Sequence, residues 1–192
     1  MKSIRCILFA MVLSGCIVDE PSYRITHPDV MYVGDSLCHR VFDVDDGIPR
    51  IYENDDRWRT AERMAGIRIN CDPGRKTTDI DGIPESKDGL PWRVLFLALG
   101  TNDAQKLPVD EFRLHYQALI DGAEFETLYC VLPNRVIKGH DAEPYRKVIR
   151  EICANVIDPL EHGVMFRAKD GVHKNKADQP GWWVAIVERI ES

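Results

Sequence analysis

The chain has 192 residues, of which 44% are hydrophobic, 29% charged and 8% aromatic, a composition typical of one globular domain. Its formal net charge of -6 argues against a nucleic-acid-binding protein, because such a protein needs a basic surface to replace the counterions of phosphate. The sequence has no apolar run long enough for a spanning helix and no Gly/Ser/Pro-rich tract. A collagen, a coiled coil, a repeat array and a multi-span membrane protein are therefore excluded.

Residues 1–15 have the pattern of a secretory signal peptide. Lys2 and Arg5 form a basic start, residues 6–13 form a short apolar core, and the segment Leu13-Ser14-Gly15-Cys16 ends it with small side chains. An ordinary signal peptide or a buried N-terminal strand would be the alternatives to a lipoprotein signal.

The ending of this segment resembles the bacterial lipobox, in which the cysteine becomes the lipidated N-terminus after cleavage. This resemblance implies that residues 1–15 are removed, that residues 16–28 form a tether, and that residues 29–192 form the domain. Acyl chains on Cys16 would then anchor the protein to a membrane of the bacterial cell envelope.

Four further cysteines follow, with no C-x-x-C pair and no Cys/His cluster at the spacing of a structural metal site. They are Cys38, Cys71, Cys130 and Cys153. In an exported chain they allow two disulfides in three pairings; the alternative is four small buried hydrophobic side chains.

Strands and helices are predicted to alternate in the first half of the domain. Residues 29–33 form a short apolar run that ends at Gly34 and predicts a buried strand, and residues 57–65 have helical character. Residues 67–69 predict a weak second strand, followed by a turn at Asp72-Pro73-Gly74. Residues 94–99 are apolar without alternation, which predicts a central strand covered on both faces.

The second half continues this alternation. Residues 107–120 predict an amphipathic helix, and residues 127–132 predict a fourth strand. The spacing of apolar residues predicts a helix over 143–157, residues 164–166 predict a short fifth strand, and residues 182–190 predict a closing helix. Five strands separated by helices or long crossovers predict an α/β fold, a parallel sheet with helices on both faces.

In such a sheet, ligands bind beyond the carboxyl ends of the strands. Polar clusters occur there: Gly34-Asp35-Ser36-Leu37, Asp72-Pro73-Gly74, Gly100-Thr101-Asn102-Asp103 and Asp170-Gly171-Val172-His173. The edge formed by these strand ends is therefore the candidate site.

Ser36 is the candidate nucleophile, because it is the only serine after residue 16 that lies at the end of a core strand. A serine hydroxyl needs a nearby base to become a nucleophile, and His173 is the candidate base. Asp170, three residues earlier, could orient the imidazole of His173. The alternative is that the segment of Ser36 and the segment from Asp170 to His173 are surface turns without a catalytic role.

Asn102 and Gly74 are candidate donors to an oxyanion. An amide held at a strand end, or a glycine N–H that a substrate can approach closely, would stabilise negative charge that develops on a carbonyl oxygen. The alternatives are a helix-capping turn at Asn102 and a glycine that only permits a positive φ.

Taken in order, Gly-Asp-Ser-Leu, a glycine, Gly-x-Asn-Asp and Asp-x-x-His resemble the motifs of the SGNH hydrolases, also called GDSL esterases and lipases. The resemblance covers the chain from about Val30 to Ile190. It implies a three-layer α/β/α sandwich of flavodoxin-like type with a five-stranded parallel sheet in the order 2-1-3-4-5.

The same resemblance implies ester hydrolysis with no cofactor and no metal. Ser36 corresponds to the nucleophile, His173 to the general base and Asp170 to its orienting partner. The backbone N–H groups of Ser36 and Gly74 and the side-chain amide of Asn102 correspond to the oxyanion hole.

Two details depart from or add to the family pattern. The second motif of the family continues from glycine with a small residue and then threonine, whereas here Gly74 is followed by Arg75-Lys76-Thr77-Thr78. Cys38 and Cys71 flank the candidate site on neighbouring strand ends, where a bridge between them would stiffen it.

The expected function is hydrolysis of short acyl esters, such as acetyl esters of envelope or extracellular carbohydrate. The expected partners are a small-molecule or polysaccharide ester and, through Cys16, a membrane, but no nucleic acid. Alternatives are a lysophospholipase or thioesterase of the same family, and a catalytically silent lipoprotein that binds glycan or protein. A metal-dependent hydrolase using His39, His140 and His162 is disfavoured, because these histidines lack the H-E-x-x-H spacing.

Overall fold

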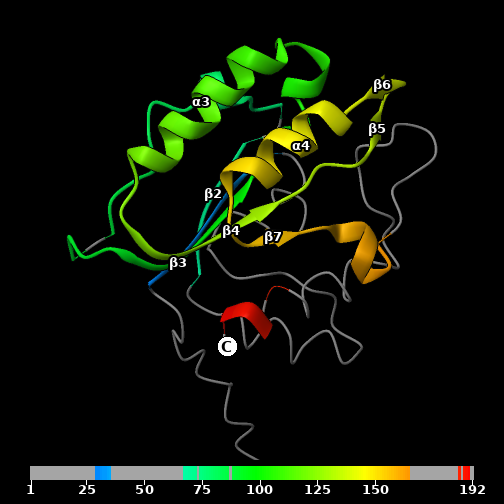
Figure 1. Ribbon diagram of the computed structural model, residues 1–192. Coiled ribbons are helices and arrows are strands. Elements are labelled where there is room, and N and C mark those ends of the chain that lie inside the picture. The colour runs from blue at the N-terminus through cyan, green and yellow to red at the C-terminus, as the bar shows by residue number, and fades with distance from the viewer. Residues whose placement is uncertain are drawn as a thin grey trace, which may run out of the picture.

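A five-stranded parallel sheet forms the centre of the molecule in the computed structural model, which describes residues 29–35, 67–72, 74–86, 88–164, 186 and 188–190 (Figure 1). The strands are β1 (Val30–Gly34), β2 (Arg68–Cys71), β3 (Trp92–Ala98), β4 (Phe125–Val131) and β7 (Val156–Ile157). They lie in the order β2-β1-β3-β4-β7, and each pairs in parallel with its neighbours. Because β7 is the fifth strand of this sheet in the chain, the predicted order 2-1-3-4-5 is confirmed.

The central strand β3 is apolar on both faces, as its sequence predicted. Leu95 and Leu97 point to one face and are fully buried. On the other face, the Phe96 ring stacks between the rings of Tyr32 and Tyr129, with centroid separations of 5.7 and 5.4 Å. A strand covered on both sides has no solvent face, so its side chains do not alternate between apolar and polar.

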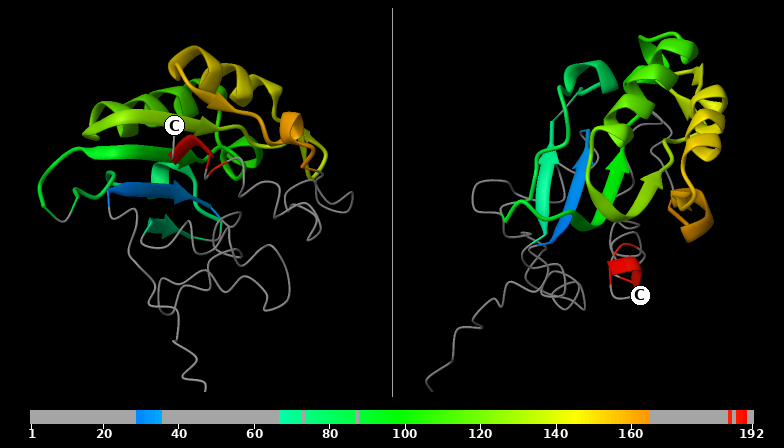
Figure 2. Two further views of the ribbon diagram at one scale, coloured as in Figure 1. Left: turned by 90° about the horizontal axis from the view of Figure 1, so that it is seen from below. Right: turned by 60° about the vertical axis from the view of Figure 1, so that its left-hand side comes forward.

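Helices cover both faces of the sheet, which confirms the three-layer α/β/α architecture. The helices α3 (Val109–Asp121) and α4 (Glu143–Ile152) lie on one face, and the helical residues near the C-terminus lie on the other (Figure 2). Ile186 and Ile190 of this last segment are at most 2% exposed and pack in the core beneath β1 and β3. Among the described residues, no helix is long and apolar enough to cross a bilayer.

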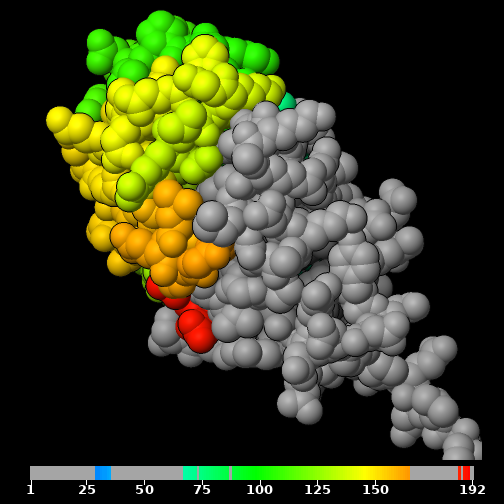
Figure 3. All heavy atoms as spheres, turned by 90° about the vertical axis from the view of Figure 1, so that its right-hand side faces the viewer, coloured from blue at the N-terminus to red at the C-terminus, as the bar shows by residue number. Residues whose placement is uncertain are grey.

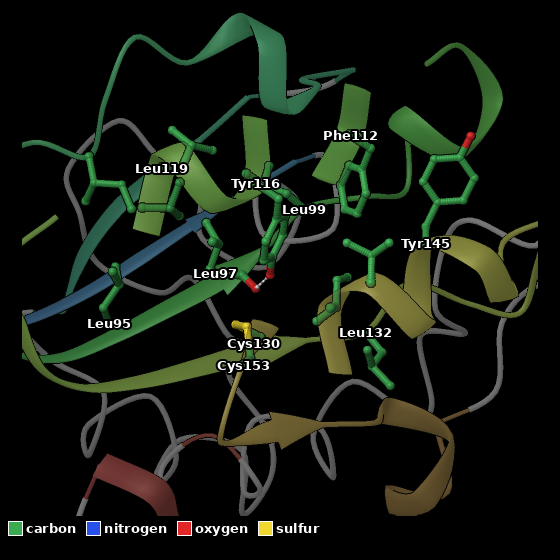
Figure 4. Close-up of a cluster of buried hydrophobic side chains, with 14 of the residues drawn as sticks. Leu95, Leu97, Leu99, Phe112, Tyr116, Leu119, Cys130, Leu132, Tyr145 and Cys153 are labelled. Carbon is green, nitrogen blue, oxygen red and sulfur yellow. Dashed lines mark hydrogen bonds between the residues drawn. A yellow bond between two sulfur atoms is a disulfide. The ribbon is translucent and has the colours of Figure 1, made fainter. Parts of the chain in front are cut away.

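The helix α3 packs through the face that its periodicity predicted. Phe112, Tyr116 and Leu119 are buried against β3 and α4 (Figure 4). The Tyr116 hydroxyl donates to the Leu97 carbonyl at 3.5 Å, so the phenol is not left without a partner. Burial raises the pKa of Tyr116 well above its usual value, so the hydroxyl stays protonated.

The predicted helix over 143–157 is too long, and the fifth strand of the sheet is not the predicted segment 164–166, of which residues 165–166 lie outside the described residues. The helix α4 ends at Ile152, and residues 156–157 form the fifth strand instead. Val156 fits the helical spacing, but valine and isoleucine also favour strands. The residue before Pro159 is driven toward extended backbone, and this proline begins the short 3-10 helix η3 (Pro159–His162).

A two-stranded antiparallel hairpin follows β4 and was not predicted. Its strands are β5 (Val136–Ile137) and β6 (His140–Asp141), and the residues between them, Lys138 and Gly139, have φ values of 48° and 83°. Positive φ at both central residues is the signature of the type I′ turn, which matches the twist of a hairpin. Figure 3 shows the surface on which this hairpin, α4 and η3 (yellow-green to orange) are exposed beside one another.

A disulfide links Cys130 of β4 to Cys153, the residue that follows α4 (Figure 4). The bridge links the sheet to the helix layer, so these two cysteines form a disulfide and are not free buried thiols. Cys71 is disulfide-bonded too. Its predicted pairing with Cys38 lies outside the described residues and stays a prediction.

We expect the double variant Cys130→Ala/Cys153→Ala to lower the free energy of unfolding by about 3 kcal/mol, because the bridge closes a loop with a sequence separation of 23 residues. Urea unfolding of the variant and of the oxidised wild type measures this difference. The control repeats the comparison with both proteins reduced: the disulfide of Cys71 is then open in both, and the two midpoints should lie close together. Equal midpoints for the variant and the oxidised wild type would contradict the prediction.

The predicted signal peptide, tether, lipidation site Cys16 and helix over 57–65 lie outside the described residues. They stay predictions.

Candidate active site

The carboxyl ends of the three strands that precede the candidate motifs lie level with one another. Gly34, the last residue of β1, pairs in register with Cys71 of β2 and with Ala98 of β3. The Asp72 N–H donates to the Gly34 carbonyl at 3.3 Å, which continues this alignment past the end of β2. The segments that follow these strands therefore begin at one edge, as the sequence predicted.

The structure describes two of the predicted site residues, Gly74 and Asn102. The other three, Ser36, Asp170 and His173, lie outside the described residues, and their roles stay predictions. The residue before Ser36 in the chain, Asp35, is fully buried directly beyond the end of β1.

The turn after β2 holds Gly74 in a conformation that favours glycine. The Arg75 N–H donates to the Asp72 carbonyl at 3.3 Å, which closes the predicted turn. Gly74 has a φ of +82°, and no described atom lies within 4 Å of a Cβ built on it. The positive φ therefore favours glycine at this position.

The Arg75 side chain stabilises the same turn. Its guanidinium donates to the backbone carbonyl and to Oδ1 of Asn70, both at 2.8 Å, and pairs with the Asp72 carboxylate at 3.2 Å. The Arg75 side chain is 13% exposed, so these bonds are partly shielded from water. The departure from the family pattern after Gly74 therefore places a structural arginine in the loop.

Asn102 follows β3 and precedes the 3-10 helix η2 (Asp103–Gln105). It occupies the N-cap position, but its side chain does not cap the helix. Instead, its Nδ2 donates to the Arg75 carbonyl at 3.1 Å. The structure thus joins the predicted donor Asn102 to the residue directly after the predicted donor Gly74, so the two loops meet.

Asp103 makes a second connection between these loops, which sequence reasoning missed. Its carboxylate is fully buried, and Oδ1 accepts hydrogen bonds from the backbone N–H of Thr77 at 2.9 Å and from its hydroxyl at 2.7 Å. Burial raises the pKa of the Asp103 carboxyl, and the bonds from Thr77 offset part of that rise. Thr77 and Asp103 are 26 residues apart, and no sequence pattern predicts a contact over that separation. The one relevant observation in the sequence is that Asp103 belongs to a predicted polar cluster but has no role assigned in it.

A buried ion pair fixes the other half of the edge. Arg146 of α4 is 0% exposed, donates to the Pro133 carbonyl after β4, and pairs with the Asp158 carboxylate after β7. Asp158 also accepts from the Leu160 N–H and so caps η3 (Pro159–His162). Arg146 therefore holds two strand ends together and is not available to a substrate.

The described residues include no group of three or more His, Cys, Asp or Glu side chains arranged to hold a metal ion. Of the histidines considered for a metal site, His140 lies in β6 and His162 in η3, while His39 is outside the described residues.

No model of a known protein family matches this chain, and no curated protein matches it in sequence. Solved structures do match it. The aryl esterase of M. smegmatis aligns with a TM-score of 0.56 and 19% identity over 84% of this chain and 97% of that one. A carbohydrate acetylesterase from Sinorhizobium meliloti aligns with a TM-score of 0.54 and 16% identity, again over 84% and 97%.

A third structure is similar over a comparable length. The C-terminal catalytic domain of peptidoglycan O-acetyltransferase A from Streptococcus pneumoniae aligns with a TM-score of 0.52 and 14% identity, over 84% of this chain and 92% of that domain. At these identities the likeness establishes the fold, and the chemistry has to be argued from the residues of this chain.

Proposed function

We propose, from its SGNH-hydrolase fold and the geometry of the sheet edge, that this chain is a serine esterase. One observation carries the proposal: the Asn102 amide, bonded at 3.1 Å to the carbonyl of Arg75, lies against the loop of Gly74. Two separate segments thus bring together the residue types that an oxyanion hole needs. The buried Asp35 precedes the proposed nucleophile Ser36 at the same edge.

In the proposed reaction, His173 accepts the hydroxyl proton of Ser36 as Oγ attacks the ester carbonyl carbon. Asp170 orients the imidazole and stabilises its charged form. The tetrahedral intermediate collapses when the C–O bond to the alcohol breaks and His173 gives its proton to the leaving oxygen. A water molecule, deprotonated by His173, then attacks the acyl-serine, which releases the acid and returns the proton to Ser36.

The oxyanion is stabilised by the N–H groups of Ser36 and Gly74 and by the amide of Asn102. A side-chain amide nitrogen carries two N–H groups, so the bond from Asn102 to the Arg75 carbonyl leaves one for the substrate while fixing the plane of the amide. A donor held in place before the reaction stabilises the transition state by roughly 3 kcal/mol.

The proposed substrates are esters of short acyl groups, acetyl groups on carbohydrate above all. Two of the structural neighbours are a carbohydrate acetylesterase and a peptidoglycan O-acetyltransferase domain, which supports this choice. Lipidation at Cys16, if the signal is used as proposed, would keep the enzyme in the bacterial envelope among such polymers.

We expect kcat/KM on p-nitrophenyl esters to be highest for acetate and to fall steadily through butyrate to palmitate, because an enzyme for the proposed acetyl esters needs no site for a long acyl chain. Protein without residues 1–15 and with the other residues intact is the enzyme for the assay. A preference for long acyl chains would contradict this prediction and would indicate lipid esters as the substrates, as expected for a lysophospholipase. A folded protein that neither hydrolyses any of these esters nor reacts with a fluorophosphonate would favour the silent binding protein.

A further inference from the structure

We infer that Asp103 is a positioning residue that sets the separation of the two oxyanion donors Gly74 and Asn102. The inference rests on the proposed function and adds to it a residue outside the predicted triad and oxyanion hole. Asp103 contacts neither the oxyanion nor the reacting atoms in this proposal. It acts through the loops that carry the donors.

The two donors lie on loops that no strand pairing connects directly. Gly74 follows β2, an edge strand, whereas Asn102 follows β3 at the centre, and β1 lies between them. Hydrogen bonds across the loops therefore determine how far apart the donors lie. Those bonds run from Asn102 to the Arg75 carbonyl and from Thr77 to the Asp103 carboxylate.

Asp103 has the stronger of these connections. Its Oδ1 receives two hydrogen bonds from Thr77, at 2.9 and 2.7 Å, whereas Asn102 makes a single bond to the Arg75 carbonyl at 3.1 Å. Its own backbone is fixed by η2, because its carbonyl accepts from the N–H groups of Lys106 and Leu107 at 2.9 and 2.8 Å. The side chain therefore extends from a rigid turn to hold the opposite loop.

Burying the Asp103 carboxylate costs free energy, so the need to fill space in the core does not account for a carboxylate at this position. Asp103 is 0% exposed, and burial disfavours its charged form, as the raised pKa of this group indicates. An apolar side chain would fill a buried position without this penalty. What the carboxylate supplies is the pair of bonds to Thr77, which is 1% exposed and only three residues beyond Gly74.

Loss of this connection should misplace a donor. Asp103 is adjacent to Asn102 in the chain, so movement between the Thr77 and Asp103 loops changes the separation of the two donors. A misplacement of about 1 Å can lower a rate by about 100-fold. The effect should fall on kcat, because the oxyanion forms only in the transition state.

The kinetic test compares Asp103→Ala, Asp103→Asn and Asp81→Ala. We expect Asp103→Ala to lower kcat by about 10-fold to 100-fold with little change in KM, and Asp103→Asn, which keeps an oxygen acceptor for Thr77, to recover most of this loss. Asp81→Ala removes an exposed carboxylate from the same β2–β3 connection and should have the wild-type kcat. The losses of Asp103→Ala and Asn102→Ala should be strongly non-additive in the double variant.

Hydrogen–deuterium exchange supplies a readout that does not depend on activity. In Asp103→Ala, amides of residues 74–80 should exchange faster than in the wild type, while those of α3 should not change. If Asp103→Ala does not fold, Thr77→Val and Thr77→Ser replace it: valine lacks the hydroxyl bond and should lower kcat, whereas serine should keep it.

Unchanged exchange in residues 74–80, a wild-type kcat for Asp103→Ala, or fully additive losses with Asn102→Ala would each overturn the positioning role. A folded wild type with no esterase activity would overturn the proposed function, and the role of Asp103 in positioning the oxyanion donors with it. The exchange measurement separates that outcome from a failure of the Thr77–Asp103 connection itself.

Discussion

Ser36→Ala is expected to lower kcat by a factor of at least about 10⁴ while the midpoint of urea unfolding stays at the wild-type value. The variant lacks the oxygen proposed to form the acyl intermediate, and in the proposed mechanism the oxyanion donors and substrate binding alone sustain only a small residual rate. Removal of a single hydroxyl usually changes stability little, so the midpoint should not shift. Initial rates on p-nitrophenyl acetate measure the loss.

The matched control is Ser86→Ala. Ser86 lies in the connection between β2 and β3, where its hydroxyl donates to the Leu90 carbonyl, and its removal should leave kcat unchanged. Mass spectrometry after fluorophosphonate treatment should find the adduct on Ser36 in the wild type and no adduct in Ser36→Ala. Retained hydrolysis in the Ser36 variant, or an adduct on another residue, would show that the nucleophile has been misassigned.

The second large effect is expected for Asn102→Ala, which should lower kcat by about 10²-fold to 10³-fold and leave KM within a small factor of the wild type. The amide is fixed by its bond to the Arg75 carbonyl at 3.1 Å, so it is oriented before the substrate arrives. In the proposed role as an oxyanion donor, its contribution grows as charge develops on the carbonyl oxygen, so the loss is expected in the transition state.

Asn155→Ala is a suitable control for this variant. The Asn155 amide also donates to a backbone carbonyl, that of Leu128, at 3.1 Å, but it directly precedes the edge strand β7 and lies beside the middle of β4, away from the loops of Gly74 and Asn102. Its loss should cost about 1 kcal/mol of stability and leave kcat unchanged. If both variants lost the same amount of stability and neither lost activity, Asn102 would be a structural residue and not an oxyanion donor.

The features that the sequence predicted correctly are those with a local cause. The apolar run at residues 94–99 predicted β3 because a strand buried on both faces needs apolar side chains at every position. The spacing of Phe112, Tyr116 and Leu119 predicted the inner face of α3. The order of polar clusters after strands predicted that Gly74 and Asn102 would meet, because parallel strands bring their carboxyl ends to one edge.

Where two local structures fit the same residues, the sequence alone did not decide between them. Val156 satisfies both the helical period and the preference of β-branched residues for strands, and it pairs with Cys130 in the sheet. The pairing of Cys130 with Cys153 was one of three combinations that the sequence allowed. In each case the choice depends on which partner lies within reach after folding.

By itself, then, the sequence determined the α/β class, the strand order implied by its motifs, and the edge at which chemistry is to be sought. Only the tertiary structure decided which strand completes the sheet, which of the possible cysteine pairs includes Cys130, and that the Asp103 carboxylate holds Thr77 across 26 residues of chain. The physical reason is the range of the interactions. Periodicity and turn preferences act between residues a few positions apart, whereas a hydrogen bond or disulfide between distant segments exists only once packing has brought both partners to the same place.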